Sequence, residues 1–278
     1  MSDLIKQFEP EKTTGDSHMT EVAQSRAQHE VQAAFVIAKK FPRDEFAAIQ
    51  KIMKACKRHS LAEKAIYMYP RGGTQVEGPS IRLAEAIASS WGNIDCGVRE
   101  VSQSNGVSVA EAYAIDLETN TRVTKTFHVK HERHTKKGVT KLKDTRDIYE
   151  LVANQGARRL RACILGVIPG DIVEEATYQC RKTLESSDEP IEQRIKRMVN
   201  AFDELGVKIE HLEKRLGHNL DVTTAHELVT LQSIYRSIKD GMASREQYFD
   251  IALKNQLEDA SQLKDLVKKK ETKKESSE

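Results

Sequence analysis

Residues 93–130 read NIDCGVREVSQSNGVSVAEAYAIDLETNTRVTKTFHVK, and the fold is decided in this stretch. It divides into three segments that favour extended strands, at 93–102, 107–117 and 122–130. Asn105 and Gly106 separate the first two segments, and this pair is typical of tight hairpin turns because both residues tolerate a positive φ. The stretch therefore predicts an antiparallel β-meander.

Helical patterns surround this meander. Apolar residues recur three or four positions apart in several segments, which is the spacing of one face of a helix. The segments with this pattern are 21–40, 41–59, 80–91 and 145–166, and a short strand is expected at 65–70. The residues expected to form the buried stripe of the second helix are Phe46, Ile49, Ile52, Met53 and Cys56. The fold class predicted is α+β, a β-meander packed with helices and followed by a small all-α module.

Changes in composition divide the chain. Serine, aspartate and Pro190 cluster at 184–193, where we place a domain boundary. Beyond it the pattern is helical, and Thr224 with Glu227 matches a capping box. The segments expected are a disordered N-terminus at 1–20, a core at 21–185, a helical module at 190–261 and a disordered charged tail at 262–278.

The composition is that of a polar protein. Hydrophobic residues make up 38% and charged residues 31% of the 278, and no apolar run approaches the ~20 residues of a membrane-spanning helix. The N-terminal stretch has early acids and no apolar segment, unlike a secretory signal peptide. The four cysteines are scattered and form no C-x-x-C pair, which favours reduced thiols. These features predict a cytoplasmic protein with no membrane partner.

Positive charge is concentrated in one segment although the net charge is only +2. Residues 122–146, which we call the basic run, contain nine Lys or Arg against Glu132 and Asp144. The rest of the chain is therefore net negative. This asymmetry predicts a localised anionic partner and not a generally basic protein.

The helix expected at 145–166 has two different faces. Small and apolar residues gather on one face: Tyr149, Val152, Ala153, Gly156, Ala157, Leu160, Cys163, Ile164 and Val167. The other side carries Asn154, Arg158 and Arg161 as a stripe, flanked by Arg159 and Gln155. No acidic residue occurs at 151–170, so these arginines have no ion-pair partner within the helix. Guanidinium groups suit phosphate oxygens, and the stripe predicts a phosphate-binding face.

A phosphate-binding loop for a nucleotide is not expected. Gly73 and Gly78 have the G-x4-G spacing of such a loop. Pro79 and Ser80, however, stand where the loop requires lysine followed by serine or threonine. Without that lysine the chain has no sign of ATP binding, and no cofactor is predicted.

Two further patterns concern metals. His128, His131 and His134 would share a face on a helix, but as strand residues they alternate, so no metal site is predicted. Carboxylates in the meander keep a nuclease metal site open as an alternative: Asp95, Glu111, Asp116 and Glu118. Nothing in their spacing requires a metal.

Three segments together suggest a family: AAIQKIMKACKRHSLAEKAIYMYP at 47–70, EGPSIRLAEAIASSWGNIDCGV at 77–98 and VANQGARRLRACILGVIPGDIVEEA at 152–176. In this order they resemble the RecT/Redβ class of phage single-strand annealing proteins. The first ends in a strand motif typical of the class, without its leading glutamate. The last resembles the late helix of the class, in which arginine lies among small residues before an acidic segment. The resemblance covers roughly residues 30–185.

The resemblance implies a non-enzymatic, ATP-independent protein in the cytoplasm of a bacterial host. Such proteins form rings or helical filaments on DNA, hold one strand by its backbone in a basic groove, leave the bases exposed for pairing and then hold the annealed duplex. The helical module at 190–261 would contact a companion exonuclease or a host single-strand-binding protein. Residues expected to contact the backbone are Arg71, Lys125, Lys130, Arg133, Lys136, Lys137, Lys141, Arg158, Arg159 and Arg161.

Several aromatic residues are candidates for base stacking in such a groove: Tyr67, Tyr69, Trp91, Tyr113 and Phe127. The residues do not distinguish annealing from a second function, a single-strand-binding accessory protein that protects strands without speeding their pairing. A metal-dependent nuclease that uses the meander carboxylates is a third alternative.

Overall fold

A computed structural model describes residues 14–71, 74–135, 138–187 and 189–251 of the chain. Within these residues it contains helices and three small antiparallel sheets, so the predicted α+β class is confirmed. The largest sheet has the strand order β3-β4-β5, with β3 at Ile94–Ser104, β4 at Val107–Asp116 and β5 at Thr121–Lys130.

The hairpin between β3 and β4 turns at Asn105 and Gly106, whose φ angles are 52° and 74°. Two consecutive positive φ values define the turn that suits the twist of paired strands, and this pair of residues adopts it readily. Along β4, buried and half-buried residues alternate. One face of the sheet is therefore covered, and the three alanines of β4 on that face leave room for a helix to approach: Ala110, Ala112 and Ala114.

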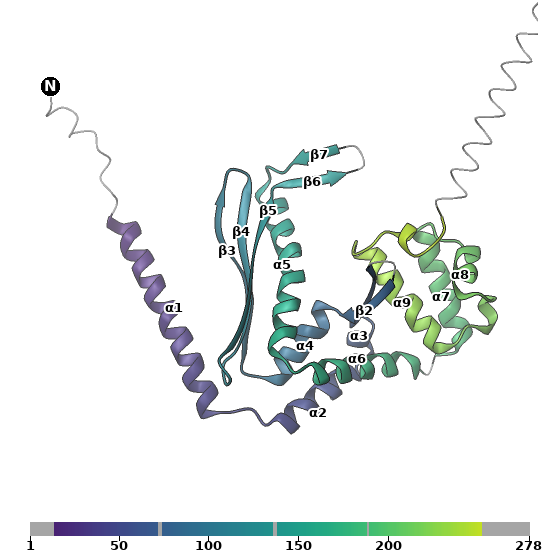
Figure 1. Ribbon diagram of the computed structural model, residues 1–278, viewed down its shortest axis with the longest axis horizontal. Helices are drawn as coiled ribbons and strands as arrows, with labels where there is room; N and C mark the ends of the chain where they lie inside the picture. The colour runs from purple at the N-terminus through teal and green to yellow at the C-terminus, as the bar shows by residue number, and fades with distance from the viewer. Residues whose placement is uncertain (1–13, 72–73, 136–137, 188, 252–278) are drawn as a thin grey trace, which may run out of the picture.

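The long helix α5, Thr145–Val167, packs on the covered face of the sheet. Gly156 makes this approach possible, because a Cβ atom at that position would lie 2.8 Å from Cγ1 of Val98 on β3. Further along the helix, the Cys163 thiol donates to the carbonyl oxygen of Ala112 over 3.4 Å. In Figure 1, α5 lies between the three-stranded sheet and the C-terminal helices.

Further helices complete the first apolar core: α2 at Glu45–Cys56, α3 at His59–Ala62, α4 at Ile81–Trp91 and α6 at Gly170–Glu185. Just before α2, Arg43 forms ion pairs with Asp116 at 2.5 Å and with Glu118 at 2.9 Å. Burial alone would raise the pKa of Glu118, but the hydrogen bonds from Asn93 and Arg43 outweigh it and lower that pKa. These contacts fasten α2 to the end of the sheet.

The C-terminal helices form a second apolar core around Phe202. The elements are α7 at Ile191–Glu204, α8 at Ile209–Leu216 and α9 at Ala225–Lys239, with short 3-10 turns at Leu220–Val222 and Arg245–Gln247. The side chain of Met68, from the strand β1 at Ile66–Arg71, belongs to this second core. The Met68 amide also donates to Oγ of Ser237 over 3.0 Å. The C-terminal helices are therefore docked on β1.

Three strands were not predicted. Strand β2, Thr74–Pro79, pairs with β1 although it ends in glycine and proline. Strands β6, Glu132–Thr135, and β7, Gly138–Lys141, pair within the basic run. Residues 136 and 137 lie outside the described residues, but Gly138 is the first residue of β7.

The first helix starts earlier than predicted. Helix α1 spans Thr14–Lys40, so the end of the stretch expected to be disordered is helical. The remainder of that stretch and the charged tail at 262–278 lie outside the described residues. The apolar residues of this helix are buried only in part, because Ala38 is 1% exposed but Val31 is 49% exposed.

Two aromatic residues expected in the core are exposed. Phe46 is 70% exposed because it lies about 120° around α2 from the buried Ile52, at 100° per residue. Tyr149 is 72% exposed because that end of α5 passes over the edge strand β3, where it borders an open hollow with Val98 and Gln103.

Candidate nucleic-acid interface

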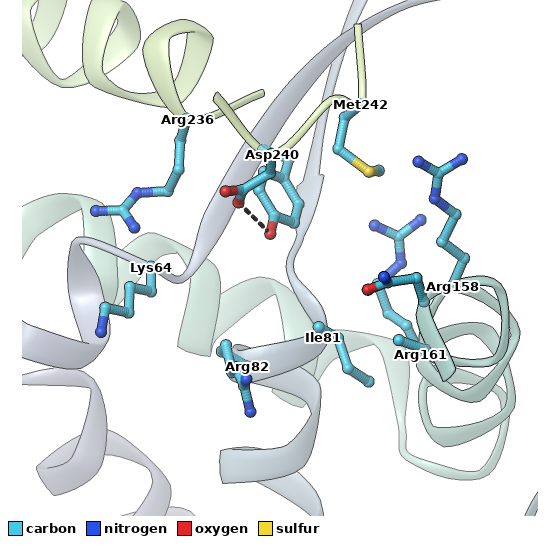
Figure 2. A pocket seen from close by; sticks show the side chains of 11 residues that line it. Lys64, Ile81, Arg82, Arg158, Arg161, Arg236, Asp240 and Met242 are labelled. Carbon is cyan, nitrogen blue, oxygen red and sulfur yellow. Dashed lines mark hydrogen bonds between the residues drawn. The ribbon is translucent and has the colours of Figure 1, made fainter. Parts of the chain in front are cut away.

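The face of α5 that points away from the sheet forms one wall of a hollow of about 740 Å³. We call this hollow the basic pocket. Its lining residues are Lys64, Tyr67, Ile81, Arg82, Asn154, Ala157, Arg158, Arg161, Arg236, Asp240 and Met242. Five of these side chains are basic, and they come from four separate stretches of the chain. Figure 2 shows Arg158 and Arg161 on one side of the pocket, with Lys64 and Arg236 on the other.

The α5 wall follows from the spacing seen in the sequence. Asn154, Arg158 and Arg161 are four and three residues apart, so they project from one side of the helix, and all three line the pocket. Gly156 faces the sheet as predicted, but Ala157, which was predicted on the same face, lines the pocket. The helix is started by Asp144, whose carboxylate accepts from the amides of Arg146 and Asp147 at 2.9 and 3.1 Å.

Three basic residues of the pocket were not among the predicted site residues. Arg82 is the second residue of α4, a helix capped by Ser80, whose Oγ accepts from the Leu83 amide over 3.2 Å. Lys64 lies just before β1, and Arg236 lies in the last turn of α9. These three residues are far apart in the sequence and belong to no common motif. The docking of α9 on β1 brings them together.

Most of these charges lack an ion-pair partner within the described residues. Arg82 lies 3.2 Å from Glu85. In the part of the chain that the structure describes, no such pair is formed by Lys64, Arg158, Arg161 or Arg236. Arg161 and Arg236 are half-buried, so their charges are less screened than those of exposed arginines. The pocket is therefore a region of positive potential open to an anion.

Asp240 is the acidic residue among those lining the pocket, and it contacts a tyrosine instead of an arginine. The hydroxyl of Tyr67 donates to Oδ2 of Asp240 over 2.9 Å, as the dashed line in Figure 2 shows. Burial, and then the hydrogen bond to Asp240, raise the pKa of Tyr67 to about 12. Tyr67 therefore remains a neutral donor at physiological pH, and its ring is held at the pocket wall.

A second, smaller hollow of about 150 Å³ adjoins the basic pocket. It is lined by Tyr69, Arg161, Met242 and Gln247, so it shares Arg161 and Met242 with the larger one. The two hollows therefore lie next to each other, and each is lined by a residue of β1. Two adjoining hollows suit an extended, multiply charged ligand better than a single small anion.

Three other predicted residues, two on β5 and one on α5, lie outside the basic pocket. Lys125 and Lys130 are both exposed, but they are five positions apart on β5 and so project from opposite faces of the sheet. Arg159 turns toward the sheet, where its guanidinium lies 4.6 Å from the centre of the Phe127 ring and donates to the Gln155 carbonyl over 3.0 Å. These three residues do not line the basic pocket.

The remaining predicted residues are also dispersed. Arg133 on β6 lies 3.6 Å from Asp147, and Lys141 on β7 is exposed. Arg71 ends β1, but its side chain lies outside the described part of the structure, as do Lys136 and Lys137. Of the ten predicted residues, the structure places Arg158 and Arg161 together in the pocket.

The residues considered for metal binding have other contacts. His131 is buried, and its Nε2 lies 2.8 Å from Oγ of Ser108. Asp116 pairs with Arg43, and Glu111 pairs with Arg99. Among the described residues, no three histidine, cysteine or acidic side chains are grouped as metal ligands.

Comparison with known proteins gives no match for the chain, whether with protein-family models, with characterised proteins or with solved structures. Within the described ranges, none of the helices has the length and apolar character needed to cross a bilayer. What the chain binds is therefore inferred from its own residues.

Proposed function

We propose that the protein binds single-stranded DNA through the sugar-phosphate backbone and anneals complementary strands without ATP. The observation that supports this most is the convergence of five basic side chains on the basic pocket. Four of the five have no ion-pair partner among the described residues. Unpaired cations that gather from distant segments repel one another, and an anionic ligand offsets that repulsion.

Phosphate is the anion that this pocket suits best. Guanidinium groups present paired donors to phosphate oxygens, and the pocket holds four arginines and one lysine. The stripe of Arg158 and Arg161 follows the axis of α5, and Arg161 also borders the smaller hollow. A chain of phosphates that passes from one hollow to the other would contact several cations in succession. Backbone contacts of this kind do not select a sequence.

Annealing, as distinct from binding alone, is proposed from the resemblance to the RecT/Redβ class. In this proposal the three-stranded sheet and its helices, at 21–185, are a single-strand annealing core that also forms rings or filaments. The module at 190–261 contacts a companion exonuclease or a host single-strand-binding protein. The protein holds the annealed duplex after pairing, and it is not an enzyme.

A salt series with a fluorescent single-stranded oligonucleotide tests the binding. For single strands, the slope of log affinity against log salt is about −0.7 for each phosphate neutralised. We expect a steep slope that becomes shallower by about 1.4 in Arg158→Ala/Arg161→Ala. The matched control is Arg26→Ala/Arg197→Ala, which removes the same charge from two exposed arginines that pair with Glu30 and Glu189.

Adding the complementary strand tests the annealing. We expect pairing faster than in buffer, without ATP, and slower in the pocket variant than in the control variant. Tight binding that slows pairing would support the alternative of a single-strand-binding accessory protein. Binding without salt dependence would contradict the proposal. Degradation of labelled DNA in Mg²⁺ or Mn²⁺ would indicate the nuclease alternative.

A further inference from the structure

Two of the aromatic candidates for base stacking already have their rings covered. Trp91 is 4% exposed, and the guanidinium of Arg43 lies 4.8 Å from its ring centre. Phe127 is 7% exposed beneath Arg159. Neither ring offers a face to a ligand.

A third candidate, Tyr113, lies on the opposite face of the sheet from α5. The central strand β4 alternates, and its buried alanines face the helix while Tyr113 does not. Its ring covers Gly97, where a Cβ atom would lie 3.3 Å from the Tyr113 hydroxyl oxygen. The guanidinium of Arg99 lies 5.3 Å from the same ring. Tyr113 lines neither hollow of the proposed DNA site.

Tyr67 and Tyr69 differ from all three in position, and they are more exposed than Trp91 and Phe127. They are two residues apart on β1, so they project from the same face of that strand, about 6.7 Å apart along it. Tyr67 lines the basic pocket and Tyr69 lines the smaller hollow, with Arg161 common to both. Both tyrosines are half-buried, so part of each side chain remains accessible.

Both rings are held in place by neighbouring residues. The hydroxyl of Tyr67 is hydrogen-bonded to Asp240, as described above. The Tyr69 ring lies over Gly78 on β2, where a Cβ atom would be 3.6 Å from Cε1 of the ring. Rings that are already positioned lose little conformational entropy when a ligand binds.

We propose that Tyr67 and Tyr69 stack bases of the bound strand while Arg161, between them, holds the backbone. This inference rests on the proposed function. Stacking uses the faces of the bases and leaves their hydrogen-bonding edges free. A strand held in this way remains able to pair with its complement. Backbone contacts alone also permit pairing, but they do not align the bases as stacking does.

The test compares a thymine oligonucleotide with an abasic oligonucleotide of equal length. Loss of one stacked base costs roughly 1–3 kcal/mol, so wild type should bind the thymine strand at least about 5-fold more tightly. Tyr67→Leu and Tyr69→Leu should each reduce that preference and leave the abasic affinity and the salt slope unchanged. Tyr69→Phe keeps the ring and its packing over Gly78 and should keep the preference. Tyr178→Leu, at an exposed tyrosine on α6, is the matched control.

The outcomes separate this inference from the proposed function. If the leucine variants lose affinity for both strands equally, or keep the full preference for thymine, the stacking inference is wrong. In that case the effect of Arg158→Ala/Arg161→Ala on the salt slope still tests the backbone site. If wild type binds neither strand, the proposed function itself fails.

Discussion

The basic run and the basic pocket concentrate positive charge in different ways. The run at 122–146 has nine basic residues within one segment of the sequence. The pocket takes single residues from distant elements and places them around one hollow. The run is the stronger signal in the sequence, but the pocket is the region in which five described basic side chains line a single hollow.

Strand geometry and local pairing explain the difference. A β-strand sends alternate side chains to opposite faces, which separates Lys125 from Lys130. Other cations of the run lie near acids: Arg122 lies 3.7 Å from Glu111, Arg133 lies 3.6 Å from Asp147 and Arg146 lies 3.1 Å from Glu150. Charge density along a chain is therefore a poor measure of charge density in space.

The largest expected effect is on DNA affinity, in a comparison of variants of the basic pocket with variants of the basic run. Arg158→Ala/Arg161→Ala should lower the affinity for single-stranded DNA at low salt by about tenfold for each arginine, because each loses a charge-assisted contact. Lys125→Ala/Lys130→Ala removes the same charge from exposed positions and should cost less than about threefold. Fluorescence anisotropy with one oligonucleotide at one salt concentration measures both.

The reverse order of effects would contradict this ranking. It would show that the run, and not the pocket, makes the main backbone contacts. Equal effects would mean that one strand contacts both regions, as the sequence alone suggests. Thermal unfolding of each variant separates lost contacts from lost folding.

The two faces of α5 offer a second contrast, in adjacent residues. Gly156→Val should lower the free energy of unfolding by about 1–3 kcal/mol. A Cβ atom at this position would already lie 2.8 Å from Cγ1 of Val98, and the valine side chain is larger still. Ala157→Val adds the same branched side chain on the pocket side and should cost no more than about 0.7 kcal/mol of helix propensity. Urea unfolding measures both.

DNA affinity should change in the opposite order. Ala157→Val narrows the basic pocket and should weaken binding, whereas folded Gly156→Val should bind like wild type. If Ala157→Val binds DNA normally, the strand does not enter the pocket at this level of the helix.

The features that were predictable from sequence depend on neighbouring residues. The turn at Asn105 and Gly106 needs only those two residues to adopt positive φ. The helix starting after Ser80 and the capping box of Thr224 with Glu227 are likewise local hydrogen bonds, and both are present. The stripe on α5 follows from helix periodicity alone. These local rules located the α5 half of the pocket.

The other half depends on tertiary contacts that no local pattern contains. Strand β2 is held by its pairing with β1, despite the low strand propensity of Gly78 and Pro79. Arg236 reaches the pocket because Met68 and Ser237 join β1 to α9. The predicted role of the C-terminal helices in partner binding did not include this contribution to the pocket.

The smallest expected effect concerns the carboxylate inside the pocket. Asp240→Asn removes a negative charge that opposes phosphate, and since Asp240 is exposed, the gain in affinity should be at most about 5-fold. Asp221→Asn, at an exposed acid of the same module outside the pocket, is the matched control and should change little. A loss of affinity in Asp240→Asn would show that the carboxylate positions Tyr67 for binding more than it repels the strand.

The same variant has a second readout in the titration of Tyr67. The pKa of Tyr67 in the folded protein, about 12, lies above the ordinary value of 10. The protonated tyrosine therefore makes its whole contribution to the free energy of unfolding below pH 10, and this contribution is lost as the pH rises toward 12. Asp240 is one cause of this rise, after burial, so Asp240→Asn should lower the pKa of Tyr67 without restoring the ordinary value. An ultraviolet titration of wild type and Asp240→Asn, with Tyr67→Phe to identify the signal, measures this change. If the titration is unchanged while DNA affinity rises, Asp240 acts on the strand through charge alone, and the ring of Tyr67 is held by its packing.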